Sequence, residues 1–504
     1  MSILHSAADD PLAARLDAIS SVDPGAPALL FAERWWTWEE LRSVGRWLRD
    51  ALASQGMAEK TVGLVARNDP LVAAGIMELL ISRRPIWILN PLSADAQLAD
   101  EMLRAPTGSF VALARDWARP SMTEVRPGLG MTIELDTRDV RLGAARPPES
   151  SSPPGPGTAA VLQTSGTTGP PKRVELAAAQ LWASLGGVSP DIRGDSQQEL
   201  RLRRGTVPLT LPLAHVGGLF GLLFPWVNGR RVALLDKFAP HAWAKIIKDH
   251  EVLTSGLVPA AMRMVLDAQI PPADLASLRS VRAGTAPVDP ELVEEFENRY
   301  RVPVITAYGA TEFGGGVASM TLQDLRRFDG SKRGSVGRPH AGVQLRIVGQ
   351  DGEGQLPPGE VGRLYVKQGT GDWVMTNDLA RLDEDGFLFI EGRVDDVINR
   401  GGFKVSLREI EQELRALPDV ADAAAIGLAD RMLGQVPAAA VVLRDGARTS
   451  GEELCEALKA TMTRYKVPTA VVIVDQIPRN VSMKVDSQAL AKLLRDPEPS
   501  RRAP

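Results

Sequence analysis

The most informative stretch of this sequence is Thr164-Ser165-Gly166-Thr167-Thr168-Gly169-Pro170-Pro171-Lys172. Its hydroxyls, glycines and lysine directly follow the apolar residues 159–162. Glycine lets the backbone approach an anion closely, and backbone N–H groups and Ser or Thr hydroxyls then donate to the anion's oxygens. The stretch therefore predicts a phosphate-binding loop. A solvated turn is the alternative that its composition leaves open.

The pattern differs from the loop of P-loop ATPases, because it lacks a Gly-Lys-Ser/Thr tripeptide and two prolines separate Gly169 from Lys172. It resembles the phosphate loop of the adenylate-forming superfamily, which comprises acyl-CoA and aryl-CoA ligases, luciferases and the adenylation domains of peptide synthetases. The resemblance implies a catalytic role for Thr164. It also implies that ATP is bound by Thr164, Ser165, Gly166, Thr167, Thr168, Gly169 and Lys172.

Size and composition narrow the classes of protein. A chain of 504 residues predicts two or three domains. With 44% hydrophobic and 24% charged residues, it fits soluble globular proteins better than disordered or membrane proteins. The 58 basic and 62 acidic residues give a net charge of −4, without the basic excess that follows a nucleic-acid backbone. We therefore expect no nucleic-acid partner.

The lack of recognisable targeting signals and the single cysteine lead us to expect a cytoplasmic protein. No stretch approaches the ~18 uncharged apolar residues of a membrane span. The N-terminus lacks the basic flank and apolar run of a signal peptide, and the terminal Arg-Arg-Ala-Pro is no peroxisomal signal. Cys455 is the only cysteine, which excludes an internal disulfide and a cysteine-rich metal site.

The N-terminal part alternates between strand and helix patterns. A capping box at residues 37–40 predicts the start of a helix. Residues 61–66 and 86–89 read as buried strands on either side of a helix at 71–82, which is a βαβ unit with parallel strands. A second series has predicted strands at 231–235, 253–258, 278–283 and 302–307, with helices at 242–250, 260–267 and 290–300.

Ligands of open parallel sheets bind beyond the carboxyl ends of the strands, where two loops are predicted. These are Ala283-Gly284-Thr285-Ala286-Pro287 and Tyr308-Gly309-Ala310-Thr311-Glu312. The second matches the superfamily's Tyr-Gly-x-Thr-Glu motif: a ring to stack on adenine, a glycine that lets the backbone close in, a hydroxyl for phosphate and a carboxylate for Mg²⁺. The resemblance implies a catalytic, metal-binding Glu312. It assigns nucleotide binding to Gly284, Thr285, Ala286, Tyr308, Gly309 and Thr311.

The segment Pro212-Leu213-Ala214-His215-Val216-Gly217-Gly218 resembles the one that borders the carboxylate pocket of acyl-CoA and aryl-CoA ligases. A single histidine on an apolar segment is otherwise more often a core residue. The resemblance implies that His215 acts in catalysis and in the pocket. Small residues leave room there for an aryl or medium acyl group: Gly217, Gly218, Ala283, Ala307 and Gly314.

The C-terminal motifs continue the resemblance. It implies that Asp378 and Arg393 bind the ribose, that Asp395 is a hinge, and that Gly401 and Gly402 line a tunnel for the coenzyme A thiol. Lys484 occupies the position of the catalytic lysine, although an exposed lysine near a chain end is ordinarily a solubility residue.

The expected fold is α/β, with a large N-terminal domain of parallel βαβ sheets plus a small mobile α+β C-terminal domain. The boundary is placed at 1–394 and 395–504. In the small domain we predict helices at 407–414 and 451–462, and strands at 423–426, 438–443 and 470–474.

The implied function is activation of a small-molecule carboxylate by ATP and Mg²⁺ to an acyl-adenylate, followed by transfer to coenzyme A. One alternative makes the same adenylate but transfers it to a carrier protein or another nucleophile, and a second is a nucleotide-binding regulator without catalysis. The chain departs from the family pattern at Arg173, Asn377, Met483, Ser487 and a short 369–376 segment. The sequence leaves the acid and the oligomeric state open.

Overall fold

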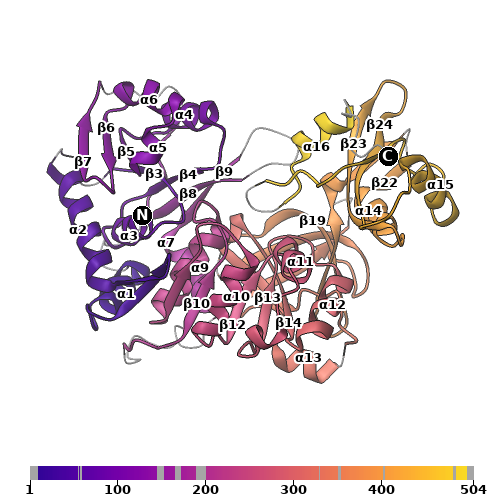
Figure 1. Cartoon of the computed structure of the whole chain (residues 1–504), viewed down its shortest axis with the longest axis horizontal. Coiled ribbons are helices and arrows are strands. Elements are labelled where there is room, and N and C mark those ends of the chain that lie inside the picture. The colour runs from indigo at the N-terminus through magenta and orange to yellow at the C-terminus, as the bar shows by residue number, and fades with distance from the viewer. Residues whose placement is uncertain are drawn as a thin grey trace. The chain divides into compact units, whose positions relative to one another are not determined.

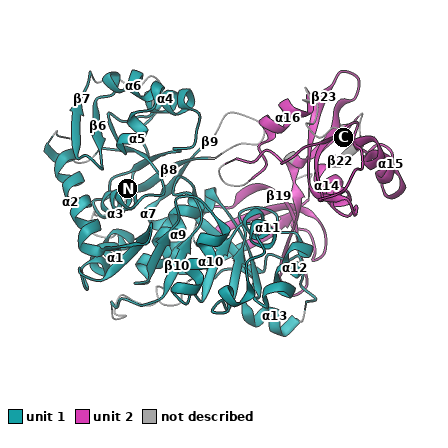
Figure 2. Cartoon of the chain, viewed as in Figure 1, with its two compact units in different colours: residues 1–166, 170–344, 368–371 teal, residues 167–169, 345–367, 372–504 magenta. Residues whose placement is uncertain are grey.

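The computed structural model describes residues 10–54, 56, 60–144, 152–164, 172–188, 200–328, 330–349, 354–369, 371–400, 403–480 and 484–495. Figure 1 shows the chain and its elements. It forms two compact units, coloured separately in Figure 2. Unit 1 contains residues 1–166, 170–344 and 368–371, and unit 2 contains residues 167–169, 345–367 and 372–504. Within the described ranges, no helix combines the length and apolar character that crossing a bilayer requires.

Unit 1 contains a seven-stranded sheet in the order β7-β6-β5-β3-β4-β8-β9. The inner strands are parallel, and an antiparallel hairpin closes each edge. Helix α3 (Pro70–Ile81) connects β3 to β4, so the predicted βαβ unit is confirmed. The strands are β3 (Val62–Val65), β4 (Ile86–Leu89), β5 (Ser109–Ala112), β6 (Met131–Glu134), β7 (Asp139–Leu142), β8 (Thr158–Thr164) and β9 (Lys172–Ala177).

Local signals set the ends of the helices near this sheet. The Thr37 N–H donates to Glu40 Oε2 at 2.8 Å and the Glu40 N–H donates to Thr37 Oγ1 at 3.2 Å, which confirms the capping box ahead of α2 (Trp38–Ser54). Asp69 caps α3 by accepting from the Leu71 N–H at 2.9 Å. The other helices here are α1 (Pro11–Ser20), α4 (Asp95–Arg104), α5 (Ala114–Trp117), α6 (Pro120–Val125) and η1 (Arg126–Gly128).

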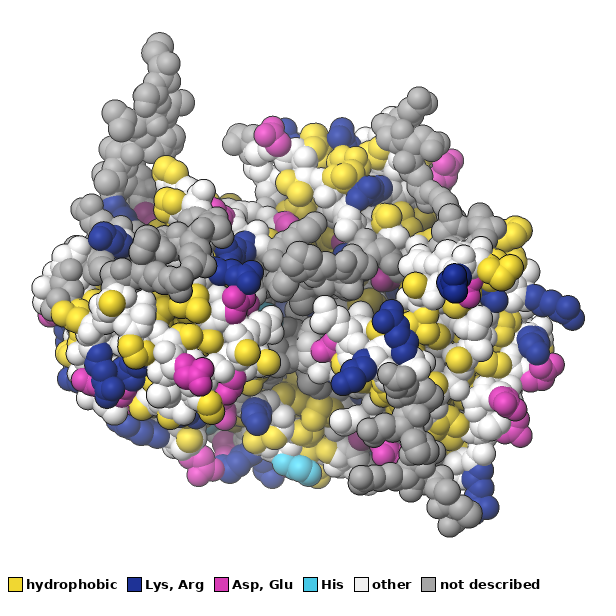
Figure 3. Space-filling model, turned by 90° about the horizontal axis from the view of Figure 1, so that it is seen from above, with side chains coloured by type: hydrophobic (Ala, Val, Ile, Leu, Met, Phe, Trp, Pro, Cys, Tyr) yellow, Lys and Arg dark blue, Asp and Glu magenta, His cyan; other side chains and the backbone are white. Residues whose placement is uncertain are grey.

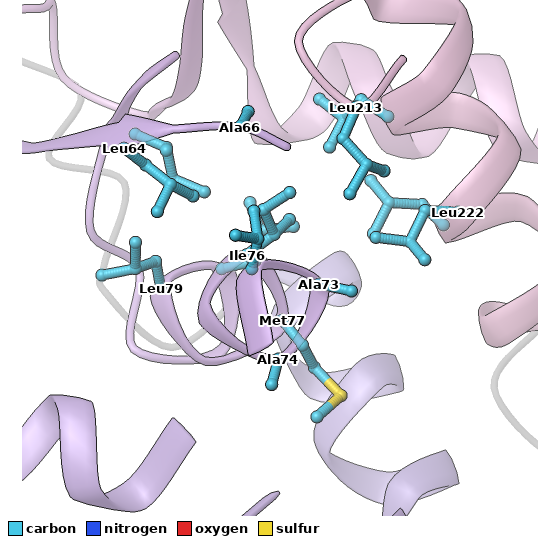
Figure 4. Packing of buried hydrophobic residues seen from close by; sticks show 14 of the residues in the cluster. Leu64, Ala66, Ala73, Ala74, Ile76, Met77, Leu79, Leu213 and Leu222 are labelled. Atoms are coloured by element: carbon cyan, nitrogen blue, oxygen red, sulfur yellow. The ribbon is translucent and has the colours of Figure 1, made fainter. Parts of the chain in front are cut away.

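Helix α3 lies in the main hydrophobic core of unit 1. Ten of its twelve residues are buried, as expected for a helix covered on several sides. Figure 4 shows Ile76 of α3 in one cluster with Leu64 of β3, Leu213 and Leu222. The segment that carries His215 is therefore fixed to the core immediately beside the candidate pocket residues.

A four-stranded sheet, also in unit 1, has the order β10-β11-β1-β2. Strand β1 pairs in parallel with β11, with Leu29 opposite Val232. This pairing joins segments about 200 residues apart, and the sequence pattern did not predict it. The strands are β1 (Pro27–Phe31), β2 (Arg34–Thr37), β10 (Thr206–Leu209) and β11 (Arg231–Leu234).

The remaining sheet of unit 1 has five strands in the order β12-β13-β14-β15-β16. The pairs β12–β13 and β13–β14 are parallel, which confirms the last three strands of the second predicted series and the helices between them. The first strand of that series, at 231–235, forms β11 of the four-stranded sheet instead. Strands are β12 (Thr254–Leu257), β13 (Ser280–Ala283), β14 (Val304–Ala310), β15 (Gly315–Ser319) and β16 (Arg338–Pro339). Helices are α7 (Ala178–Val188), α9 (Val216–Val227), α10 (Pro240–Asp249), α11 (Pro259–Asp267), η2 (Pro272–Leu275), α12 (Pro290–Tyr300), η3 (Thr311–Phe313) and α13 (Leu322–Phe328).

The second predicted ligand loop is wrong as a loop. Tyr308, Gly309 and Ala310 form the end of β14, and Thr311 and Glu312 begin the short helix η3. Strand β14 extends this far because β15 folds back on it and supplies antiparallel partners, with a bulge between Tyr308 and Gly309. Strand β15 was not predicted, because it is short and rich in glycine.

Unit 2 contains two sheets. The first has the order β17-β18-β19-β20, with β17 (Val343–Val348), β18 (Gly362–Gln368), β19 (Val374–Leu382) and β20 (Leu388–Arg393). The second has the order β22-β21-β24-β23, with β25 on β24. Its elements are η4 (Val394–Asp396), β21 (Val397–Arg400), β22 (Phe403–Ser406), α14 (Leu407–Arg415), β23 (Val420–Asp430), β24 (Gly434–Leu443), α15 (Gly451–Thr461), β25 (Val471–Ile473) and α16 (Ser487–Arg495).

Alternation along the second sheet explains how its helices pack. Ala423 and Ala425 belong to the core shared with α14 and α15, whereas Ala424 belongs to the core shared with α16. Successive strand residues point to opposite faces, so each face carries its own apolar set. The predicted helices and strands of this region are confirmed.

The surface carries charges of both signs. In the face seen in Figure 3, Lys and Arg side chains are interspersed with Asp, Glu and hydrophobic side chains among the coloured residues. This mixture agrees with the small net charge of −4.

Candidate active site

The predicted phosphate loop connects two paired strand ends at one edge of the seven-stranded sheet. Thr164 ends β8, Lys172 begins β9, and the two residues are partners in the hairpin register. The intervening residues lie outside the described part of the chain: Ser165, Gly166, Thr167, Thr168, Gly169, Pro170 and Pro171. The structure therefore locates both ends of the loop in the sheet, while phosphate binding stays a prediction.

Glu312 is carried by η3, which two side chains of α7 hold in place. Gln180 Nε2 donates to the Glu312 carbonyl at 2.7 Å, and Ser184 Oγ donates to the Phe313 carbonyl at 2.8 Å. Residues four apart lie on the same face of a helix, so both bonds arise from one face of α7. The Glu312 side chain itself is exposed.

Strand β9 packs beside η3. The strand that follows the predicted phosphate loop therefore lies beside the short helix that carries Thr311 and Glu312, although about 140 residues separate the two elements in the sequence. This contact brings together two motifs that the sequence could only place in order along the chain.

Gly309 and Gly284 are required by the protein's own backbone. A Cβ at Gly309 would lie 2.3 Å from the Gly315 carbonyl oxygen, and one at Gly284 would lie 2.8 Å from the Ala307 carbonyl oxygen. Contacts this short do not occur for real side chains. Whereas the sequence suggested that Gly309 admits a ligand, the structure gives it a packing reason. Nucleotide binding by either glycine stays a prediction.

Thr285 adopts a conformation that is unusual for its type. It has φ of 67°, in the left-handed region that a β-branched residue rarely occupies, at a cost of roughly 1–3 kcal/mol. Strain of this kind gathers at ligand-binding loops. A Cβ at Gly217 would lie 3.7 Å from Thr285 Cγ2, so the start of α9 adjoins the loop that contains Thr285 and Ala286. No sequence signal indicated the strain.

The predicted pocket residues lie around the start of α9 and the ends of β13 and β14. His215 is the N-cap of α9 and is half-buried. A Cβ at Gly218 would lie 1.9 Å from the Pro212 carbonyl oxygen, and Ala283 is fully buried. Gly314 has φ of 64°, which ends η3. The backbone packing and conformation thus explain why these positions hold small residues. Their place in a substrate pocket with Gly217 and Ala307 stays a prediction.

The predicted ribose residues belong to unit 2. Asp378 of β19 and Arg393 of β20 are register partners, and Arg393 Nη1 lies 3.8 Å from Asp378 Oδ1. Arg363 Nη2 donates to Asn377 Oδ1 at 2.7 Å, and Arg363 Nε donates to the Thr376 carbonyl at 2.8 Å. Asn377, which stands where the family pattern usually has glycine, therefore accepts a hydrogen bond from Arg363 in this chain. The motif alone did not indicate this partner.

Lys484 also belongs to unit 2 and is exposed. Its N–H donates to Asn480 Oδ1 at 3.1 Å, and the Asn480 N–H donates to the Lys484 carbonyl at 2.7 Å. Arg479 and Val485 form an isolated β-bridge, so the ends of this segment meet ahead of α16. These bonds join the described residues on either side of 481–483.

The predicted hinge and thiol tunnel are untested. Asp395 lies in η4 between β20 and β21, and the two compact units divide the chain elsewhere, chiefly at residue 345. A hinge concerns motion, so the assignment of Asp395 and the 394/395 boundary stay predictions. Gly401 and Gly402 lie outside the described residues. Among the residues that the structure describes, no group of three His, Cys, Asp or Glu side chains could hold a metal ion.

Comparisons with known proteins agree with the motifs. Residues 16–376 match the family model of the AMP-binding enzyme, and residues 409–484 match that of the AMP-binding enzyme C-terminal domain. The chain is 29% identical over 512 residues to an indoleacetate–CoA ligase from Aromatoleum aromaticum, covering 95% of this chain and 97% of that protein. It is 31% identical to the fatty acid–[acyl-carrier-protein] ligase ScoC of Streptomyces coeruleorubidus, covering 67% of each protein.

The fold has a close structural counterpart. The ATP-bound crystal structure of MatB from Rhodopseudomonas palustris superposes with a TM-score of 0.80 at 23% identity, covering 97% of this chain and 99% of that one. At this identity the similarity establishes the fold, a large α/β domain with a small C-terminal domain. Since the matched family model spans most of the sequence, the chain belongs to the AMP-binding enzyme family and is an adenylate-forming ligase of the acid–thiol class.

Proposed function

We propose that this protein activates a small-molecule carboxylic acid with ATP and transfers the acyl group to the thiol of coenzyme A, releasing AMP and pyrophosphate. The observation that carries the proposal is the packing of β9, the strand that follows the phosphate loop, against η3, the helix that contains Thr311 and Glu312. Membership of the family and the indoleacetate–CoA ligase relative support the reaction type.

A carboxylate is a poor acyl donor because its leaving group would be oxide. Attack of the carboxylate on the α-phosphate of ATP forms a carboxylate–phosphate bond and breaks the bond to pyrophosphate. Negative charge gathers on the phosphate oxygens during this step, so positioned N–H groups, hydroxyls and cations lower the barrier. Residues 164–172 supply such donors at the pyrophosphate end, and Lys484 supplies a cation for the substrate carboxylate and the α-phosphate.

The residues present fit a magnesium ion. Mg²⁺ is usually held by one or two carboxylates together with substrate phosphates, rather than by a cage of protein ligands. Glu312 offers an exposed carboxylate beside β9. When bound there, the ion would neutralise phosphate charge. Asp378 and Arg393 would hold the ribose, as one accepts and the other donates hydrogen bonds.

The second half-reaction is displacement of AMP by a thiol. The thiolate sulfur bonds to the acyl carbon and the acyl–phosphate oxygen bond breaks, with AMP leaving. Lys484, Gly401 and Gly402 occur in the same unit yet serve different half-reactions, so a rotation about Asp395 is part of the proposal. His215 and the small residues at the start of α9 would border the acyl group.

A screen of pyrophosphate release over aromatic, aliphatic and amino carboxylates tests the activation step. Mass analysis of products formed with coenzyme A then tests the acceptor, with an acyl-CoA thioester as the expected result. The relative ScoC gives the rival acceptor, because it is a ligase for an acyl carrier protein. An adenylate that accumulates without any coenzyme A adduct would favour that rival. ATP binding without carboxylate-dependent pyrophosphate release would contradict the ligase proposal altogether.

A further inference from the structure

Arg173 immediately follows Lys172 on β9, at a position where the family pattern commonly has glycine. Its Cζ lies 4.5 Å from the centroid of the Trp87 ring. Trp87 belongs to β4 and is 5% exposed, and β8 separates β4 from β9 in the sheet order. The arginine therefore reaches across one whole strand to a fixed ring in the interior of the sheet.

A second contact connects the same place to α4. Glu101 of α4 is 6% exposed, hydrogen-bonds with Gln163 and is attracted to Arg173. Gln163 is the register partner of Arg173. Burial raises the pKa of Glu101 and lowers the pKa of Arg173, while each charge opposes the other's shift. The two groups thus stabilise one another's ionised forms at the base of the hairpin.

Helix α4 is itself firmly placed on this face of the sheet. Leu98 and Met102 of α4 share a buried cluster with Trp87 and with Val161 of β8. The ring and the carboxylate that face Arg173 are consequently both set in packed structure. Packed side chains in a core occupy fixed rotamers, so they are suitable anchors for a more exposed group.

The start of β9 needs such an anchor. Strand β9 is the last strand of the sheet and pairs only with β8 in it. The connection that carries the glycines and hydroxyls joins β9 directly at Lys172. A glycine-rich loop loses much conformational freedom when it closes on phosphates, and a fixed end lowers that loss.

We propose that Arg173 is a positioning residue: by lying over Trp87 and facing Glu101, it holds the first residues of β9 and preorganises the phosphate loop for ATP. This inference rests on the proposed function of that loop. The role is specific to this chain, because the glycine that the family pattern commonly has at position 173 would have no side chain to form either contact.

The test is direct titration of ATP with Mg²⁺ in the absence of carboxylate, using the full chain and its R173A and R173K variants. Loss of a cation–π contact predicts about three- to tenfold weaker ATP binding by R173A, and R173K should recover part of the loss because it keeps the charge. In steady-state assays, the KM for ATP should rise. The KM for the carboxylate and thioester formation from presynthesised acyl-adenylate should stay unchanged.

R138A is the matched control. Arg138 lies over Trp47 at 5.9 Å, in the turn between β6 and β7 at the opposite edge of the same sheet. It should bind ATP as the wild type does. Wild-type ATP affinity in R173A, or equal losses in both variants, would overturn the proposal. If the wild type binds ATP but activates no carboxylate, the proposed function fails, whereas the comparison of R173A with R138A still decides the role of Arg173.

Discussion

Substitution of Gly309 by alanine tests whether this glycine serves packing. The added Cβ would lie 2.3 Å from the Gly315 carbonyl oxygen and 3.0 Å from Gly316 Cα, and both neighbours are backbone of β15. An ordinary contact needs about 1 Å more than the shorter of these distances, so β14 and β15 must separate. Overpacking of this kind costs about 1–3 kcal/mol, and the rigidity of both strands favours the upper part of that range.

Gly256→Ala is the matched control for this change. Gly256 lies in β12 of the same sheet, and a Cβ there would meet nothing within 4 Å. Reduced freedom of the unfolded chain should make this variant more stable by about 0.4–1 kcal/mol.

Urea unfolding of the two variants and the wild type gives the free energies, with a fluorescence signal from unit 1. We expect Gly309→Ala to unfold at lower urea concentration with an unchanged slope. It should also bind ATP more weakly, because Tyr308 and η3 flank the displaced strand end. If Gly309→Ala is as stable as Gly256→Ala, the Gly315 carbonyl can turn away, and the packing argument is wrong.

Three further substitutions test the site and the core. Lys484→Ala should lower carboxylate-dependent pyrophosphate exchange by about 100-fold or more. Thioester formation from presynthesised acyl-adenylate should be unaffected, and Lys492→Ala of α16 is the control. Equal loss in both assays would contradict the assignment of Lys484 to the adenylation step alone. Asp378→Ala should weaken ATP binding by about 10- to 100-fold through lost charge-assisted hydrogen bonds, whereas Asp385→Ala in the following turn should not. Glu78 of α3 is 1% exposed, burial raises its pKa, and Arg42 and Arg49 lie no closer than 3.7 and 3.6 Å. Its protonated form stabilises the fold below pH ~4.5, and this contribution is lost as pH rises through the raised pKa. In urea unfolding, Glu78→Gln should therefore gain stability relative to the wild type as pH rises above ~4.5, and a difference that stays constant with pH would refute this.

In the candidate site, the sequence identified the residues, and the structure showed which of them are in contact. The motifs identified which residues to examine, since each combines glycine, hydroxyls and charge in an order that a single turn does not have. They could not show that η3 adjoins β9, that Gly309 faces the backbone of β15, or that Arg363 supports Asn377. Each of these contacts joins residues that the chain must fold to bring together.

The sequence by itself determined the elements and their type in the βαβ series, because helix caps and the spacing of apolar residues act over a few positions. It also determined the family, since the motifs are contiguous. Only the tertiary structure decided that β1 pairs with β11, that β14 continues through Tyr308, and that Arg173 lies over Trp87. Strand partners and side-chain contacts of this kind depend on packing between distant segments, and no local pattern encodes the distant partner.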